Sequence, residues 1–476
     1  MLSKDLNNMI ATTKQWMRQR HPGAYEALKV QYHNMRKRMA SQKGQPHTVL
    51  KREQYPEVEF IAEMSRLPAP RILEIGSRKV VGSMPRQLIS SKAEFIGLDI
   101  MEGQGVDVVG DAHRLSELFE PETFDGVYSA AVFEHIAMPW KVALEINRVL
   151  RRGGFVYIGS HHTYPMHEMP WDFWRYGNEA FSTIFGTFNG FEVENEGLVW
   201  PASLCHHDTE SVVANGHRCY LFTHVLARKT HDYNPADYKW DIDCMDILPE
   251  WHFYPEKTGV TVIDEGIEIK RGYRALEKPV GCVDALFDGF IRDVKQQQQR
   301  PRVAFLTTPA GEKALGGNNR SGLRVEMQRY RDVKSARAIY SLSKQVEAGR
   351  FDAVILWDVL GLLEYPWVAA ISIAHMIRQG GRLFVLDRNT KPLGRQQDLW
   401  RFSSEALRVL FNPAVGLEVE DALIADPATL YPKNMADPIF KYYNKDDACY
   451  FTSACVATRV EATVRERFRW NVGKKV

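Results

Sequence analysis

The chain has 476 residues, about three times the usual length of one domain, so two or three domains are expected. Hydrophobic residues make up 45% of it and charged residues 25%, which excludes a disordered, collagen-like or supercharged protein. The net charge of +2 is uneven, because residues 1–52 hold eleven lysines and arginines against two acids, and residues 459–476 hold six against two. The rest of the chain is therefore acidic.

No apolar run comes near the roughly 18 residues that a membrane helix needs, and residues 1–10 carry charges where a signal peptide is apolar. The six cysteines form no CxxC pair, which argues against a disulfide scaffold or a zinc knuckle. We expect a soluble, cytoplasmic protein whose thiols stay reduced.

Residues 1–45 are predicted to form a basic helical arm. Apolar residues recur at helical spacing over 6–17 and again over 25–39, with a His-Pro-Gly break between the two stretches. The second stretch is too short to be stable alone, so it should pack on the body or on a partner chain. A basic arm could contact nucleic acid, an anionic membrane or the acidic body of another subunit, or it could simply be solvated.

From residue 70 the sequence alternates between short apolar runs and helical stretches, which predicts a parallel sheet with crossover helices. The clearest strands are expected at 71–76, 94–99, 124–129 and 154–159. Ligands of open α/β sheets bind at the carboxyl ends of the strands, so a site is expected there.

The sequence also repeats itself, at an offset of 227 residues that becomes 226 after one deletion. Four segments match in register: 124–127 with 351–354, 139–140 with 366–367, 153–154 with 380–381, and 172–176 with 398–402. Agreement over such a span predicts two homologous α/β domains.

The strand ends carry residues suited to binding a nucleoside. Glu74 and Gly76 close the first strand, where a glycine lets the backbone approach a ligand and a carboxylate can accept hydrogen bonds from an ammonium group. Asp99 ends the second strand, where a carboxylate can bind both ribose hydroxyls. Asp111 follows a third apolar stretch and could hold the adenine amine.

Residues 71 to about 160 resemble the class I S-adenosylmethionine-dependent methyltransferases. The matching segments are, in order, LeuGluIleGlySer, GlyLeuAsp, GlyAspAla, PheAspGlyValTyrSerAlaAlaValPheGluHisIle and LeuArgArgGlyGlyPhe. The resemblance implies a Rossmann-like fold, S-adenosylmethionine as the cofactor, and a cofactor site made of Glu74, Gly76, Ser77, Asp99, Ile100, Asp111, Ala112, Ser129 and His135. The first motif departs from many members by continuing as Ser77-Arg78, with Gly82 as a later glycine. No GxGxxG is present, which disfavours a Rossmann dehydrogenase.

The second copy lacks the cofactor residues. Phe305 stands where the first copy has Glu74, and Thr307 stands where it has Gly76. A degenerate methyltransferase-like domain that keeps its fold without a cofactor is therefore expected. The predicted parts are a basic helical arm at 1–45, a methyltransferase domain at 46–230, a connector at 231–300, the degenerate domain at 301–462 and a basic tail at 463–476.

Residues 161–176 follow the predicted strand at 154–159 and should face the transferring methyl group. They are similar to a Pro-x-His-x-x-Pro-x-Asp-aromatic-x-Arg-aromatic loop of methyltransferases found with sugar and polysaccharide synthesis. Imidazole has an ordinary pKa of about 6.5 and can take the proton of a hydroxyl, which makes His161, His162 and His167 candidate catalytic residues. His167 is the first choice, because prolines on either side restrict its backbone.

Two neighbouring features have competing interpretations. Asp172 and Arg175 recur in the second copy as Asp398 and Arg401, so this pair could serve only to hold the loop. Metal binding is suggested by the histidines and by CysHisHisAsp at 205–208, but hard cations prefer converging carboxylates and zinc prefers closer cysteines. No metal is predicted.

The predicted function is O-methylation of a sugar or glycan hydroxyl. Alternatives are methylation of another small molecule, a protein or a nucleic acid, and a non-catalytic scaffold that binds S-adenosylmethionine. The chain has neither the Asn/Asp-Pro-Pro-Tyr motif of amino methylation nor the Pro-Cys motif of cytosine methylation, which disfavours a nucleic acid acceptor. The two repeats could form a pseudo-dimer, or the chain a homo-oligomer.

Overall fold

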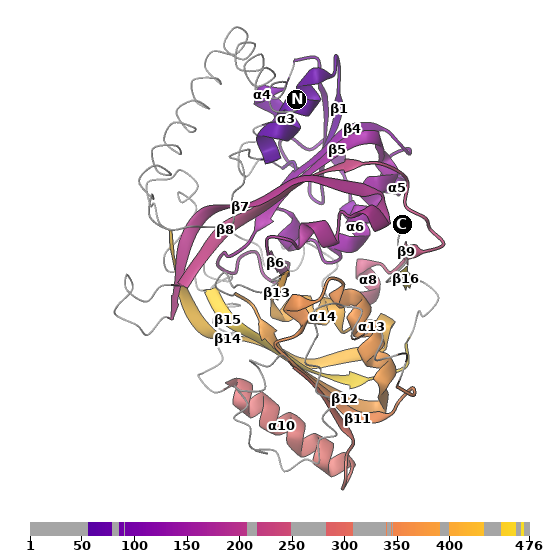
Figure 1. Ribbon diagram of the computed structural model, residues 1–476, viewed down its shortest axis with the longest axis vertical. Coiled ribbons are helices and arrows are strands. Elements are labelled where there is room, and N and C mark those ends of the chain that lie inside the picture. Colours follow the sequence, from indigo (N-terminus) through magenta and orange to yellow (C-terminus); the bar gives the residue numbers. More distant parts are fainter. Residues whose placement is uncertain are drawn as a thin grey trace, which may run out of the picture.

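The computed structural model describes residues 56–78, 85–89, 91–206, 217–248, 282–307, 346–390, 399–432, 449–462 and 468–470, with the single positions 339 and 344. One sheet of twelve strands runs through both halves of the described chain (Figure 1). The predicted basic arm, Gly82 and Asp398 lie outside the described residues. Within the described part, no helix is both long and apolar enough to cross a membrane.

The first half of the chain contributes the strand order β3-β2-β1-β4-β5-β8-β7. Its strands are β1 (Arg71–Ile75), β2 (Glu94–Asp99), β3 (Val108–Val109), β4 (Phe124–Ala130), β5 (Leu150–His161), β6 (Trp174–Tyr176), β7 (Phe191–His206) and β8 (His217–Lys229). Strands β3, β2, β1, β4 and β5 are parallel, whereas β8 runs antiparallel to β5 and β7. The four predicted strands are confirmed as β1, β2, β4 and β5, and the mixed α/β class is confirmed with them.

Helices cover both faces of this half-sheet. They are α3 (Pro56–Arg66), α4 (Pro85–Leu88), α5 (Leu115–Leu118) and α6 (Pro139–Val149), with short 3-10 turns η1 (Ala112–Arg114), η2 (Phe133–His135), η3 (Phe181–Thr183) and η4 (Thr187–Asn189). Side chains alternate along β1, so Ile72 packs with α3 while Leu73 belongs to the core that includes α6. A Cβ on Gly126 would lie 2.5 Å from Met64 Sδ, so the close approach of α3 requires glycine there.

The second half contributes the order β10-β11-β12-β15-β14, which repeats the first half's β1-β4-β5-β8-β7. Its elements are α10 (Cys282–Gln297), β10 (Val303–Thr307), β11 (Phe351–Trp357), η6 (Leu360–Leu362), α13 (Pro366–Met376), β12 (Ile377–Arg388), β13 (Trp400–Phe402), α14 (Ser404–Leu410), η7 (Pro413–Val415), β14 (Leu417–Pro432) and β15 (Cys449–Arg459). Strands β10, β11 and β12 are parallel, and β15 is antiparallel to its neighbours.

Residues that the sequence repeat aligns with one another meet where the two halves join. Three such pairs are in contact: Leu204 with Leu430 across β7 and β14, Arg175 with Arg401 across β6 and β13, and Trp140 stacked on Trp367 with ring centroids 4.6 Å apart. The hydrogen bonds beside β6 and β13 are reciprocal, because Gly177 N donates to Leu399 O at 2.7 Å and Ser403 N donates to Phe173 O at 2.9 Å. Each half therefore presents the same surface to the other.

The predicted connector and the predicted tail are joined to each other. Strand β9 (Tyr238–Trp240) pairs antiparallel with β16 (Phe468–Trp470), and α8 (Cys244–Ile247) follows β9. Trp240 and Trp470 add to an aromatic core that also contains Trp140 and Trp367. Part of the tail is thus a strand of the folded body.

Candidate functional site

The end of β1 makes a sharp turn at Gly76. The backbone of Gly76 is left-handed, with φ +78°, and a Cβ there would lie 2.1 Å from Val132 Cγ2, so only glycine fits. The N–H groups of Gly76 and Ser77 donate to Leu98 O at 2.8 and 3.1 Å. The Ser77 side chain is buried, and its Oγ has no hydrogen-bond partner among the described residues. A cradle with an unsatisfied hydroxyl lies where the sequence predicts the cofactor.

Glu74, the predicted ammonium ligand, is buried beside α4. Arg86 donates from Nε to Glu74 Oε2 at 2.5 Å, and its guanidinium also lies over the Phe95 ring, 5.3 Å from the centroid. A protein guanidinium thus occupies one oxygen of this carboxylate. This ion pair could not be predicted from the sequence, because the two residues are twelve positions apart in different elements.

Asp99 ends β2 and holds the turn that follows. Its Oδ2 accepts the Arg78 N–H at 3.2 Å, and its Oδ1 accepts the Met101 N–H at 3.1 Å. The next residue, Ile100, is 43% exposed although it is strongly apolar. A carboxylate beside an exposed aliphatic side chain suits a ribose with a flat base lying over the Ile100 side chain.

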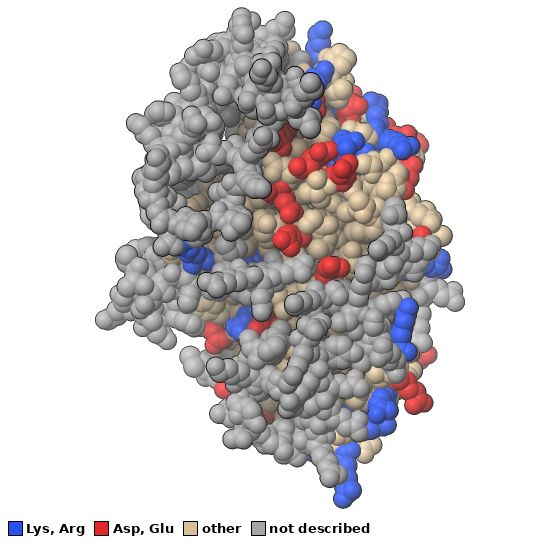
Figure 2. Space-filling view, viewed as in Figure 1, with Lys and Arg blue, Asp and Glu red and all other residues tan. Residues whose placement is uncertain are grey.

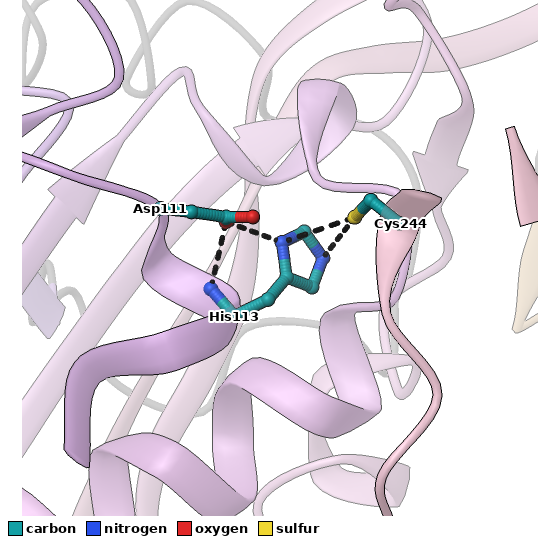
Figure 3. Close-up of side chains that lie close together, drawn as sticks. All are labelled: Asp111, His113 and Cys244. Carbon is teal, nitrogen blue, oxygen red and sulfur yellow. Dashed lines mark hydrogen bonds and ion pairs between the residues drawn. The ribbon is translucent and has the colours of Figure 1, made fainter. Parts of the chain in front are cut away.

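Asp111 caps η1, and its side chain is directed at His113 (Figure 3). Its Oδ1 accepts the His113 N–H at 2.9 Å and lies 2.6 Å from His113 Nδ1. Both contacts use Oδ1 and the side chain is 33% exposed, which leaves Oδ2 for the predicted adenine amine. Ala112, the first residue of η1, is half-buried next to it.

Asp111, His113 and Cys244 are close enough together to suggest a metal site, but His113 has no lone pair to offer. Its Nδ1 faces Asp111, and its Nε2 accepts the Met138 N–H at 3.1 Å. Figure 3 shows the Cys244 Sγ facing both ring nitrogens, at 3.5 and 3.9 Å. This trio fastens η1 to the start of α6 and to α8, because His113 Nδ1 lies against Asp111 while Nε2 accepts from Met138.

A second cluster forms beyond the ends of β4 and β5, around Glu134. This side chain is fully buried, its Oε2 accepts the Ser160 hydroxyl at 2.5 Å, and its Oε1 lies 3.0 Å from His161 Nε2. Ligand atoms of Glu134, His161 and His167 all lie within 4.8 Å of one another. His161 also stacks on Tyr164, with ring centroids 4.1 Å apart.

The orientation of the His167 ring is fixed by contacts at Nδ1. Its Nδ1 lies 3.1 Å from Pro165 O and 3.2 Å from Asp172 Oδ2, and its backbone N–H donates to Asp172 Oδ2 at 2.9 Å. Nδ1 therefore carries the proton, and Nε2 is the nitrogen with a free lone pair. The imidazole is 28% exposed, the most accessible of the three candidate histidines.

Asp172 and Arg175 do hold the loop, as one of the two interpretations predicted. Arg175 donates from both terminal nitrogens to the Asp172 carboxylate, and it also donates to Tyr164 O at 3.1 Å and to Pro165 O at 2.8 Å. The same Asp172 orients His167, so holding the loop and orienting the imidazole are one arrangement.

His135 and Ser129, both predicted to bind the cofactor, have different surroundings. Ser129 is fully buried at the end of β4, with no hydrogen-bond partner for Oγ among the described residues. His135 lies in the second cluster, because its Nδ1 contacts Trp171 O at 2.8 Å and its ring meets His167 edge to face at 4.8 Å. Its Nε2 is 3.8 Å from carboxylate oxygens of both Glu134 and Glu168.

His162 points away from this cluster to the junction of the halves. It is fully buried, its Nδ1 lies 2.9 Å from Tyr176 O, and the Arg401 guanidinium lies 3.3 and 3.4 Å from its two ring nitrogens. The second half has Asn389 at the equivalent position, whose Nδ2 donates to Phe402 O at 3.0 Å. The repeat aligns Phe402 with Tyr176, so both halves make the same bond.

One comparison with known proteins matches part of the first half. The sequence model of a family described as a methyltransferase domain matches residues 73–158. Residues 73–158 therefore match a methyltransferase domain, in agreement with the resemblance that the sequence motifs show. Curated protein sequences give no match.

Several solved structures are similar to part of this chain at low sequence identity. The YcgJ protein of Bacillus subtilis is 13% identical over 37% of this chain and 98% of its own, with a TM-score of 0.29. S-adenosylmethionine-dependent methyltransferases of Aquifex aeolicus and Archaeoglobus fulgidus are 14% and 16% identical, over 36% and 37% of this chain and 88% and 95% of theirs, each with a TM-score of 0.25.

In the second cluster, the charges of Glu134, His161 and His167 influence one another's pKa values. Burial alone would raise the pKa of Glu134, but the neighbouring imidazoles hold it well below its ordinary value. Burial lowers the pKa of His161 to about 4, against the opposing effect of Glu134. The pKa of His167 is raised instead, because Asp172 outweighs the effect of burial. Burial, reinforced by Arg401, keeps the pKa of His162 well below its usual range.

Sequence reasoning did not assign a role to Glu134 or Ser160, although the structure places both at the centre of the cluster. Glu134 was visible as the acid before His135, just past the fourth strand, and Ser160 as the polar residue near the end of the fifth. Neither pattern alone shows that the two side chains meet. The side chains of Cys205 and His206 are not described, and His207 and Asp208 lie outside the described residues.

Proposed function

We propose that the methyltransferase domain transfers a methyl group to an oxygen acceptor, a sugar or glycan hydroxyl. The observation that carries this proposal is the convergence of Glu134, His161 and His167 beyond the ends of β4 and β5. Strand β4 lies between β5 and β1, and the end of β1 forms the cradle at Gly76. Acceptor chemistry and cofactor residues thus share one edge of the sheet.

The cradle residues fit the cofactor. Gly76 would leave room for the ligand, Ser77 would offer its hydroxyl, Asp99 would bind the ribose hydroxyls and Asp111 would accept the adenine amine at Oδ2. S-adenosylmethionine supplies a methyl group on a sulfonium centre, and the domain's main task is to align an acceptor oxygen with it. His167 Nε2 is the proposed proton acceptor, and Asp172 holds the ring in the tautomer that this role needs.

We also propose that the second half is a degenerate copy joined to the first as an internal pseudo-dimer. The three contacts between repeat-aligned residues and the shared strand order support this. Gly361 stands at the position of Glu134, and a Cβ there would lie 2.8 Å from Trp400 O, so the second half has no room for the acidic side chain. One cofactor per chain is expected.

Other acceptors remain as alternatives: another small molecule, a protein or a nucleic acid, or no acceptor at all in a scaffold. Figure 2 shows a column of acidic side chains on the described surface of the first half, which disfavours a polyanion on that face. The test is transfer of labelled methyl groups to glycans, nucleotide sugars, small phenols, protein and RNA. Label only in RNA or protein would contradict the proposed acceptor, and label in none would favour the scaffold.

A reducing compartment, the cytoplasm, is the proposed location. Cys244 and Cys455 are free thiols among the described residues, which is consistent with this proposal.

A further inference from the structure

We propose that Glu134, His161 and His167 bind one divalent transition metal ion. The binding itself follows from the geometry of these side chains, and only its role in catalysis rests on the proposed function. Glu134 is fully buried and His161 is 11% exposed, while His167 is the most accessible of the three. Their ligand atoms all lie within 4.8 Å of one another. The ion would lie between the ends of η2 and β5 and the loop that follows β5.

The first argument is the direction of the lone pairs. His167 is bound through Nδ1 to a backbone carbonyl and to the Asp172 carboxylate, so Nε2 is left to face a ligand. A carboxylate or carbonyl behind an imidazole is the usual outer contact of a metal-binding histidine, since it fixes both tautomer and ring orientation. Arg175 in turn fixes Asp172 through two hydrogen bonds.

The second argument is the contact between Glu134 and His161. Glu134 Oε1 lies 3.0 Å from His161 Nε2, yet Oε1 makes no hydrogen bond of acceptable geometry. Two ligands bound to one ion at about 2.1 Å each lie roughly 3.0–3.5 Å apart without pointing at each other. The other oxygen, Oε2, is held by the Ser160 hydroxyl, which leaves Oε1 as the coordinating atom.

The third argument is charge. A buried carboxylate is unfavourable unless it is paired. Arg175 is 2% exposed and both of its terminal nitrogens are bound by Asp172, so the guanidinium is used elsewhere. Glu168 adds a second acid at the rim, 3.8 Å from His135 Nε2. A cation between these groups satisfies Glu134.

The ligand set indicates the class of ion. Two imidazoles and one carboxylate suit zinc, manganese or ferrous iron, and three protein ligands leave a position open for water or substrate. The trio of Asp111, His113 and Cys244 contains softer ligands but has no free imidazole lone pair. The second half has Arg388 in place of His161, bound to Asp358 at 3.1 Å, so one ion per chain is expected.

Under the proposed function the ion would bind the acceptor oxygen. The hydroxyl would lose its proton to Glu168 or to solvent, the new carbon–oxygen bond would form as the carbon–sulfur bond breaks, and the thioether would leave. His167 Nε2 would then be a ligand, whereas in the ion-free protein the same lone pair is the proton acceptor. His167 Nε2 can therefore either coordinate the ion or accept the proton, but not both at once. Ion titration distinguishes the two roles.

The experiment is calorimetric titration of the full chain, freed of metal with a chelator, with zinc chloride and with manganese chloride. We expect one ion per chain. In Glu134→Gln and in His167→Ala we expect the affinity for the ion to fall by about 100-fold or more. His231→Ala removes a histidine that bonds to Thr230 outside the cluster and should bind the ion unchanged. Cobalt absorption in the visible range gives a second readout of the same site.

Titration of the same proteins with S-adenosylmethionine shows whether each variant is folded. The inference is overturned if folded wild-type protein binds no ion, or if all three variants bind it alike. Glutamate at 134 could matter for folding, so Glu134→Asp serves as a milder variant with the same expected direction. Ion binding without any methyl transfer would contradict the proposed function and leave the site intact. If methyl transfer proceeds at an unchanged rate in the presence of a chelator, the proposed function stands but the ion has no role in catalysis.

Discussion

Arg175 and Arg401 lie opposite each other in the β6–β13 pair, and the internal repeat aligns these same two residues. A strand that pairs antiparallel with its own counterpart about a central residue obeys a two-fold relation. Leu204 with Leu430 and Trp140 with Trp367 obey the same relation. In a symmetric homodimer, equivalent residues of the two subunits meet at the two-fold axis. The three contacts here, each between equivalent residues of the two halves, show this arrangement within one chain.

This two-fold relation predicts that the second half of the chain positions residues 161–176, the segment that carries the candidate catalytic histidines. Arg401→Ala should slow methyl transfer with little change in affinity for S-adenosylmethionine, because Arg401 contacts His162, which directly follows His161 in the chain. Arg378→Ala, which breaks an ion pair with Asp352 in the second half, is the matched control. The measurement is the rate constant beside the cofactor dissociation constant. Equal losses in both would contradict a positioning role.

The stacked tryptophans should couple the stabilities of the halves. Trp140 and Trp367 are each 1% exposed, so either substitution by alanine is expected to reduce the free energy of unfolding by about 3–5 kcal/mol. A double-mutant cycle should give a coupling energy of roughly 0.5–1.5 kcal/mol. Denaturant unfolding measures both quantities. Strictly additive losses would show that the stacking contributes nothing beyond burial.

Gly76→Ala tests the cradle. A left-handed backbone disfavours alanine by about 1–2 kcal/mol, and the clash with Val132 adds to this, so cofactor binding should be lost. Gly197→Ala is the control, since a Cβ there meets nothing within 4 Å and its backbone is not left-handed. Calorimetry with S-adenosylmethionine is the readout. Normal binding by Gly76→Ala would place the cofactor elsewhere.

The three histidines should separate into two groups. His167→Ala should slow transfer by about 10²–10⁴-fold, the range of a general base, with cofactor affinity nearly unchanged. His162→Asn should keep most activity and stability, because Asn389 makes the same bond to Phe402 that His162 makes to Tyr176. Single-turnover rates measure the difference. A severe loss in His162→Asn together with an active His167→Ala would reverse the assignment.

The positions of the strands along the chain and their ends could be predicted from the sequence, because apolar runs that stop near Glu74, Asp99 and Asp111 are local signals. The repeat was visible for the same reason. The partners of those residues were not predictable: Arg86 reaches Glu74 from another element, and Arg401 reaches His162 from 239 residues away. Such contacts are decided by packing, which a single sequence does not display.

The histidine loop shows the same limit more sharply. Its residue types and prolines pointed to acceptor chemistry, and the Asp172–Arg175 pair was foreseen. The sequence showed neither converging carboxylates nor closely spaced cysteines, and for these two reasons no metal was predicted. Glu134 and His161 are 27 positions apart, and only the adjacency of β4 and β5 brings them together.

The central claim is that the first half alone binds S-adenosylmethionine, at the edge formed by Gly76, Asp99 and Asp111. Equilibrium dialysis of the full chain tests it directly, with Asp99→Ala beside the wild type. We expect one cofactor per chain, and loss of binding in the variant, because each charge-assisted hydrogen bond to ribose contributes roughly 1.5–3 kcal/mol. Two equivalent sites per chain, or unchanged affinity in Asp99→Ala, would contradict the account.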